Sequence, residues 1–183
     1  DRELLAGEVT WLRGLLERHD DRVVPERPVG SRRLDDLATR FGLSPFERDV
    51  LLLAAAVELD GATASVVAAL AGTADPRPTF GMALAVLPDG HWDALTPSGP
   101  LRRWHLVRLQ PNPTVATARL GIDETILHHL VGLDTPDPQL DPIAARPDPL
   151  SLLSPGQQRQ VDEAAAMALA AGGPVVVHVD GDD

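Results

Sequence analysis

One predicted helix in this chain is apolar on almost every side, and such a helix has to lie inside the fold. Residues 50–57 contain only Val, Leu and Ala. Ser44, Pro45 and Glu47 precede this run, and they form a helix start: the side chains of Ser44 and Glu47 can each bond the backbone N–H of the other, and Pro45 fits the first helical position. We therefore predict a buried central helix that extends to about residue 59.

The remaining elements follow from apolar spacing, helix caps and breaks at Gly or Pro. Further helices or helical turns are predicted at residues 2–20, 31–41, 62–71, 79–86, 92–95, 100–104, 123–130 and 155–171. The predicted caps are Ser31, Ser44, Thr79, Asp123 and Ser154. Residues 106–109 and 118–122 predict two short strands joined by a loop.

The order of these elements is typical of a winged-helix domain. Residues 34–41 and 44–59, joined by a short glycine turn, would form the helix-turn-helix pair, and the two strands would form the wing. The expected fold class is therefore mainly α with a small β-hairpin. The winged-helix-like domain is expected at residues 31–132, after an N-terminal helix and linker at residues 1–30.

The last third of the chain is rich in proline and acidic residues. Prolines recur in residues 133–153 and predict an extended linker at a domain boundary. In residues 154–183, a helix precedes an apolar strand at residues 175–179, which leads to Gly181. A phosphate loop, G-x-x-x-x-G-K-[ST], would begin at Gly181 and continue beyond the last residue. The same residues also suit an ordinary buried strand followed by a polar end.

Composition argues against several functions. The net charge of −11 disfavours a general nucleic-acid binder. All cationic side chains are Arg, so these residues offer no Lys for a phosphate loop, and there is no Cys. His128 and His129 are adjacent and would point about 100° apart on a helix, so we predict no metal site. We also predict no catalytic residue. No apolar run approaches the roughly 18 residues of a membrane span, and the expected location is the cytoplasm.

The local basic patch is formed by Arg102, Arg103, Trp104 and His105, together with Arg108. Arg102, Arg103, Trp104 and Arg108 are the candidate interaction residues, for nucleic acid or for an acidic protein surface. The helix at residues 62–71, with which this fold would read DNA, contains no Arg, Lys, Asn or Gln. Two functions stay open: a protein-interaction module, or a DNA-binding winged-helix transcriptional regulator.

Residues 43–51 resemble the start of helix-turn-helix domains in bacterial response regulators. A wider resemblance covers almost the whole chain, through residues 41–56, 77–85, 100–107 and 122–130. These blocks look like the N-terminal region of bacterial AAA+ ATPases encoded with phage-tail-like contractile injection systems. In that family a winged-helix region precedes the ATPase core, whose first strand leads into the phosphate loop. The resemblance implies that residues 154–183 begin a truncated α/β ATPase core.

The resemblance also implies that this part is accessory and not catalytic. The loop Lys, the acidic metal-binding motif and the sensor residues are absent from these 183 residues. We therefore expect no cofactor for this part of the protein, and ATP and Mg²⁺ for the parent ATPase. The expected partners are proteins, either injection-system components or ring subunits, recruited for ATP-driven remodelling. Nucleic acid and membranes are not expected as partners.

Overall fold

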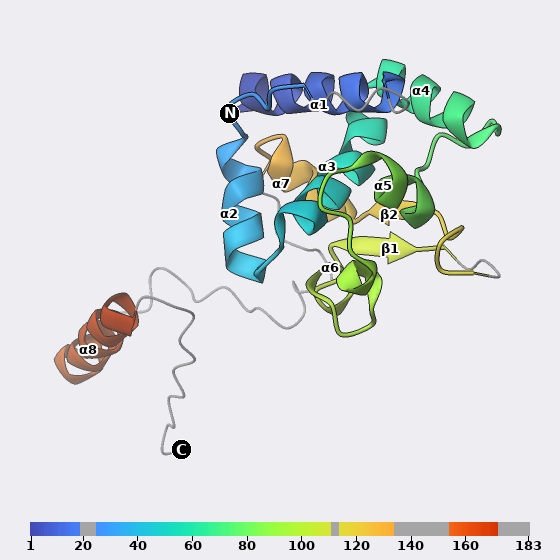
Figure 1. Cartoon of the computed structure of the whole chain (residues 1–183). Helices are drawn as coiled ribbons and strands as arrows, with labels where there is room; N and C mark the ends of the chain where they lie inside the picture. The colour runs from blue at the N-terminus through green and yellow to red at the C-terminus, as the bar shows by residue number, and fades with distance from the viewer. Residues whose placement is uncertain (19–24, 111–113, 134–153, 172–183) are drawn as a thin grey trace. The chain divides into compact units, whose positions relative to one another are not determined.

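A computed structural model describes residues 1–18, 25–110, 114–133 and 154–171. The chain divides into two compact units, Asp1–Pro138 and Gln139–Asp183. The elements of the first unit are α1 (Arg2–Glu17), α2 (Arg32–Phe41), α3 (Pro45–Leu59), α4 (Gly61–Ala71), α5 (Phe80–Val86), the 3₁₀ turn η1 (Trp92–Leu95), α6 (Pro100–Arg103), β1 (Val107–Leu109), β2 (Leu120–Ile122) and α7 (Glu124–Leu130), as Figure 1 shows.

Helix α3 is the buried centre of the first unit, as the sequence predicts. Every residue from Phe46 to Val57 is buried, and α1, α2, α4 and β2 pack against the helix (Figure 1). The predicted helix start is confirmed, because Ser44 Oγ accepts from the Glu47 N–H at 3.1 Å and Glu47 Oε2 accepts from the Ser44 N–H at 2.8 Å. Helix α3 is thus the scaffold for α1, α2, α4 and β2.

Helix α1 lies in the same compact unit as the helices that follow it. Its Leu5, Leu12 and Leu16 side chains are almost completely buried and belong to the common hydrophobic core. The helix packs against both α3 and α4. Burial of this apolar face contributes to the same core that α3 organises.

The two strands form the expected antiparallel hairpin. Val107 pairs with Ile122, and Leu109 pairs with Leu120. An isolated antiparallel bridge joins Arg119, just before β2, to Thr79, just before α5. The fold is mainly helical with a small two-stranded antiparallel sheet, as predicted.

The cap of α2 differs from the prediction in one respect. Ser31 occupies the N-cap position, but its hydroxyl donates to Asp1 Oδ2 at 2.7 Å and accepts no bond from the helix. The Asp1 carboxylate instead accepts from the backbone N–H of Arg32 at 2.8 Å and of Arg33 at 3.5 Å. The carboxylate of Asp1, the residue just before α1, therefore satisfies donors that the adjacent serine was expected to satisfy.

In the second unit the described element is α8 (Pro155–Ala171). Its predicted start is confirmed, because Ser154 Oγ accepts from the Gln157 N–H at 3.3 Å and Gln157 Oε1 accepts from the Ser154 N–H at 2.9 Å. Most of the predicted linker at residues 133–153, the predicted strand at residues 175–179 and Gly181 lie outside the described residues.

Within the described ranges, no individual helix has the length and apolar character to cross a membrane. Only α3 and α4 taken together reach that length and composition, and they are bent by 111° relative to each other.

Candidate interaction surfaces

The four predicted interaction residues make different contacts in the structure. Arg102 Nη1 donates to the Leu95 carbonyl at 3.0 Å and so holds α6 against η1. Arg108 lies on β1, and its Nη2 is 2.5 Å from Asp123 Oδ2 at the start of α7. The Arg108 side chain is 71% exposed, but this carboxylate neutralises its charge. Only Arg103 and Trp104 remain together on the surface.

Arg103 and Trp104 form a surface feature with Phe41, the last residue of α2. The Trp104 ring is 5.7 Å from the Phe41 ring, and the Arg103 guanidinium lies over the Trp104 ring at 5.2 Å from its centroid. Trp104 remains 49% exposed, and Arg103 forms no ion pair within the part of the chain that the structure describes. We call these three residues the aromatic patch. Exposed Trp and Arg are the side chains most enriched among residues that dominate binding energy at protein interfaces.

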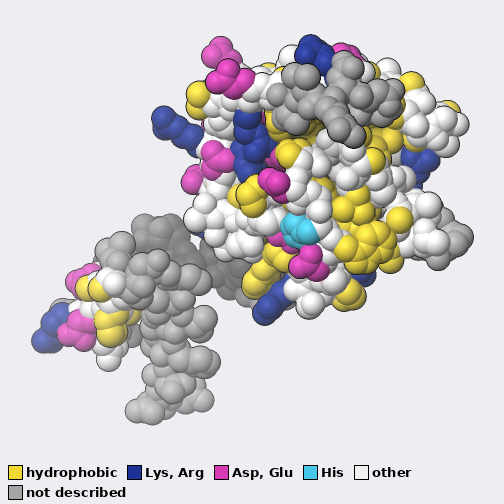
Figure 2. Space-filling view, in the orientation of Figure 1, with side chains coloured by type: hydrophobic (Ala, Val, Ile, Leu, Met, Phe, Trp, Pro, Cys, Tyr) yellow, Lys and Arg dark blue, Asp and Glu magenta, His cyan; other side chains and the backbone are white. Residues whose placement is uncertain are grey.

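A second exposed aromatic residue, Trp92, was not singled out by the sequence. It is 62% exposed, and its ring is 5.5 Å from the ring of the buried Phe80. Figure 2 shows hydrophobic side chains gathered on the face that carries α5, α6 and β1. Apolar spacing predicts helices but does not indicate which aromatic ring ends on the outside, so the sequence held no signal for Trp92.

Ser44, His91 and Asp93 form a chain of hydrogen bonds that the sequence also did not reveal. Ser44 Oγ is 2.8 Å from His91 Nε2, and His91 Nδ1 is 2.7 Å from Asp93 Oδ1. The hydrogen bond with His91 lowers the pKa of Asp93. The order of groups is that of a nucleophile, a base and an orienting carboxylate. Here, however, Ser44 Oγ also caps α3, and neither pocket that we describe is lined by these residues. This chain of hydrogen bonds joins η1 to the start of α3.

Neither a nucleotide site nor a metal site is located. The predicted loop residue Gly181 lies outside the described residues. Over residues 1–18, 25–110, 114–133 and 154–171, no three His, Asp or Glu side chains are grouped so that they could hold a metal ion. The adjacent His128 and His129 lie on α7, where the guanidinium of Arg33 donates to the His129 carbonyl at 3.1 Å.

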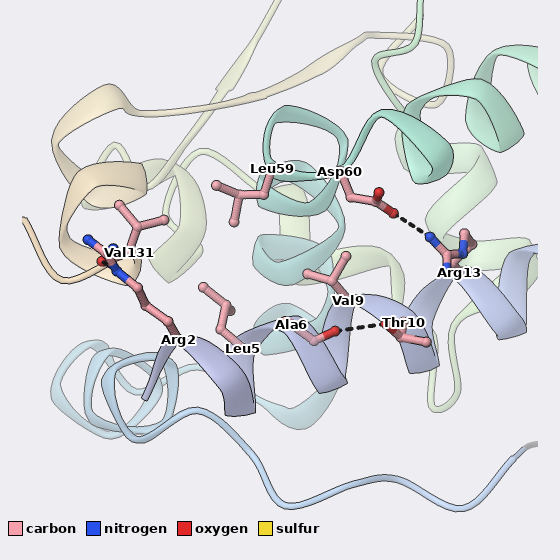
Figure 3. A pocket seen from close by; sticks show the side chains of 9 residues that line it. All are labelled: Arg2, Leu5, Ala6, Val9, Thr10, Arg13, Leu59, Asp60 and Val131. Atoms are coloured by element: carbon pink, nitrogen blue, oxygen red, sulfur yellow. Dashed lines mark hydrogen bonds and ion pairs between the residues drawn. The ribbon is translucent and has the colours of Figure 1, made fainter.

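A groove of about 550 Å³ lies between α1, the end of α3 and the end of α7 (Figure 3). We call it the α1 groove, and its lining residues are Arg2, Leu5, Ala6, Val9, Thr10, Arg13, Leu59, Asp60 and Val131. A second pocket, of about 480 Å³, lies between α4, α5 and the residues just before β2. The sequence did not predict the α1 groove, because it exists only when three elements that are distant in the chain meet.

Ion pairs and hydrogen bonds define both ends of the α1 groove. At one end, Arg2 Nε donates to the Val131 carbonyl at 2.6 Å. At the other, Arg13 Nη1 lies 2.7 Å from Asp60 Oδ2. Hydrogen bonds, first of all from the Thr63 hydroxyl, lower the pKa of Asp60. This carboxylate therefore stays charged and paired with Arg13 at neutral pH.

A buried helix with helices packed around it and a two-stranded wing is the architecture of winged-helix proteins. The family model described as "Winged helix domain, variant" matches residues 11–144, which is most of the chain, and the chain belongs to this family. No curated protein and no solved structure matches the chain.

Proposed function

We propose that this winged-helix domain is the non-catalytic protein-interaction module of a AAA+ ATPase that acts in a contractile injection system. The module recruits substrates or partner proteins for ATP-driven remodelling in the cytoplasm. The observation that supports the interaction role is the aromatic patch, in which a half-exposed Trp104 lies between Phe41 and Arg103, and Arg103 has no ion-pair partner among the described residues. The sequence resemblance supports the ATPase and injection-system parts.

The composition of α4 favours a protein partner over DNA. Ala62, Ser65 and Ala69 are the exposed side chains on the body of this helix, and they carry no positive charge and little ability to read base edges. Helix α4 also packs on α1 and α3, which occupy its other faces. Helix α4, the helix that we expected to read DNA, is therefore poorly suited to this role.

DNA binding by a transcriptional regulator is the second candidate function. Arg108 is the candidate contact for it, because this side chain is exposed on β1, in the wing, although Asp123 pairs with it. Fluorescence anisotropy with random duplex DNA at low salt tests it. We expect no binding. Binding in the micromolar range that weakens steeply with salt and is lost in Arg108→Ala would support the regulator and contradict the interaction module.

The interaction module is tested in the full-length protein by Trp104→Ala, with Trp92→Ala as the matched control. We expect Trp104→Ala to weaken co-purification with injection-system components at least about tenfold and to leave basal ATP hydrolysis unchanged. Trp92→Ala should retain both the co-purification and the basal ATP hydrolysis. Equal behaviour of the two variants would contradict the role of the aromatic patch. The ATPase part fails if the gene segment after residue 183 lacks the Gly, Lys and Ser/Thr of a phosphate loop.

A further inference from the structure

We propose that the α1 groove binds an amphipathic helix of a partner protein, and that this helix places a carboxylate side chain on Arg2. The proposal rests on the interaction role proposed above and deepens it, because it names the chemistry of a ligand at a second surface. It does not involve the aromatic patch.

The middle of the groove is apolar. Leu5 and Val9 are buried at its floor, and Figure 3 shows Leu59 and Val131 above them. Leu59 is 38% exposed, although the α3 residues from Phe46 to Val57 are all buried. A large aliphatic side chain thus emerges from the central helix at this groove. Aliphatic side chains of a partner would cover Leu59 and remove it from water.

The end of the groove at Asp60 needs no ligand. Asp60 Oδ2 accepts from the Thr63 N–H at 3.0 Å, from the Thr63 hydroxyl at 2.6 Å and from Arg13 at 2.7 Å. Asp60 Oδ1 accepts from the Ala62 N–H at 3.2 Å. Cation and carboxylate neutralise each other here, so this end attracts neither sign of charge.

The end at Arg2 is different, because its positive charge has no acidic partner among the residues that the structure describes. One donor, Nε, is used by the Val131 carbonyl, and that bond fixes the plane of the guanidinium. The two terminal nitrogens are left as a planar pair of donors, the geometry that binds a carboxylate with two hydrogen bonds. Arg2 also begins α1, where the helix dipole adds positive potential.

The shape of the groove fits a helix. The lining residues of α1 follow one face from Arg2 to Arg13 at spacings of three and four. At 1.5 Å per residue this face is about 16 Å long, the length of roughly three helical turns. Apolar anchors at helical spacing with one polar end are how an amphipathic helix lies in a groove. Among the described residues that line the groove, Arg13 is paired with Asp60 and Arg2 has no acidic partner. The carboxylate of the partner therefore lies at the Arg2 end.

Fluorescence anisotropy with two labelled synthetic helices tests the proposal on the whole chain. The first is an alanine-based peptide of about 12 residues with leucines three and four residues apart and one glutamate a turn beyond them; the second has glutamine in place of glutamate. We expect the chain to bind the glutamate peptide about tenfold more tightly. Arg2→Gln should abolish this difference. Leu59→Asp should abolish binding of both peptides.

Two controls keep the outcomes distinct. Arg32→Gln, an exposed arginine on α2, should retain the preference for glutamate. Trp104→Ala should leave binding unchanged, so that failure of the aromatic patch and failure of the groove are separate results. Circular dichroism checks that each variant is folded, and Leu59→Ala replaces Leu59→Asp if the latter is not.

Three results would overturn the proposal: no binding of either peptide, equal affinity of the chain for both, or an undiminished preference in Arg2→Gln. Sedimentation of the chain alone provides a further test. Self-association that is lost in Leu59→Asp would place a second copy of the chain in the groove, and the partner-helix assignment would then be wrong.

Discussion

Some charged side chains of this domain are buried in the folded protein. Asp49 lies on the buried helix α3, and burial raises the pKa of its carboxyl group. The opposing influence is Arg27, whose Nη2 bonds Asp49 Oδ1 from the segment before α2. Arg48 contributes less at 3.6 Å. A buried carboxylate of this kind is tolerated because it is paired.

Arg27→Ala should therefore lower the free energy of unfolding by about 2–3 kcal/mol, because it leaves Asp49 charged, buried and poorly paired. Part of the loss comes from the Trp11 ring, over which Arg27 lies at 4.3 Å. Urea unfolding measures the change. Adding Asp49→Asn should recover part of the lost stability, since it removes the unpaired charge. A double variant that is less stable than Arg27→Ala would contradict this account.

The stability of the domain should depend on pH through Asp75, whose pKa is lowered in the fold, whereas that of Asp49 is raised. Hydrogen bonds from the Arg77 side chain and backbone lower the pKa of Asp75 from 3.8 to about 2, and Arg119 adds a smaller attraction. Because the pKa is lower in the folded state, the stabilisation is present above about pH 4 and is lost as the pH falls toward about 2. Asp75→Asn should therefore have a lower unfolding free energy than the parent protein at pH 5 and about the same value near pH 2. A difference that stays constant over this range would contradict the assignment.

At the scale of elements, Asp60 joins three helices. It ends α3, caps α4 through the Ala62 and Thr63 N–H groups and pairs with Arg13 on α1. Asp60→Ala should cost about 2 kcal/mol in unfolding free energy, because cap and ion pair are lost together. Asp60→Asn keeps an oxygen for the cap and should cost about half as much. Equal losses in urea unfolding would show that the cap contributes little.

The elements themselves were largely predictable. The helix start at Ser44 and Glu47 and the cap at Ser154 were expected and are present, because a cap and its donors lie within three residues of each other. The cap of α2 was assigned to Ser31, yet the acceptor is Asp1, 31 residues before Arg32. No local pattern indicates an acceptor that arrives from another helix.

For the whole molecule, the division into compact units predicts that residues 1–138 fold without the rest. The hydrophobic core described for the chain lies entirely within this unit, from Leu5 to Leu130. The isolated segment should show the same thermal midpoint by circular dichroism as the whole chain, within about 2 °C. A midpoint lower by about 5 °C or more would indicate that residues 139–183 support the fold.

The candidate sites were less predictable than the fold. Arg102, Arg103, Trp104 and Arg108 share a short stretch of sequence, but Arg102 and Arg108 bond Leu95 and Asp123, respectively. Trp104 and Arg103 form the aromatic patch together with Phe41, which lies on another helix. Closeness in sequence does not determine which face of the fold a side chain reaches.

The sequence by itself determined the order of the helices, the hairpin and the buried position of α3. Apolar spacing, caps and glycine or proline breaks act over a few residues, so they can be recognised without the fold. Only the tertiary structure decided the aromatic patch and the α1 groove. These surfaces join side chains that are far apart in the chain, such as Arg2 and Val131, and such contacts depend on how whole helices pack.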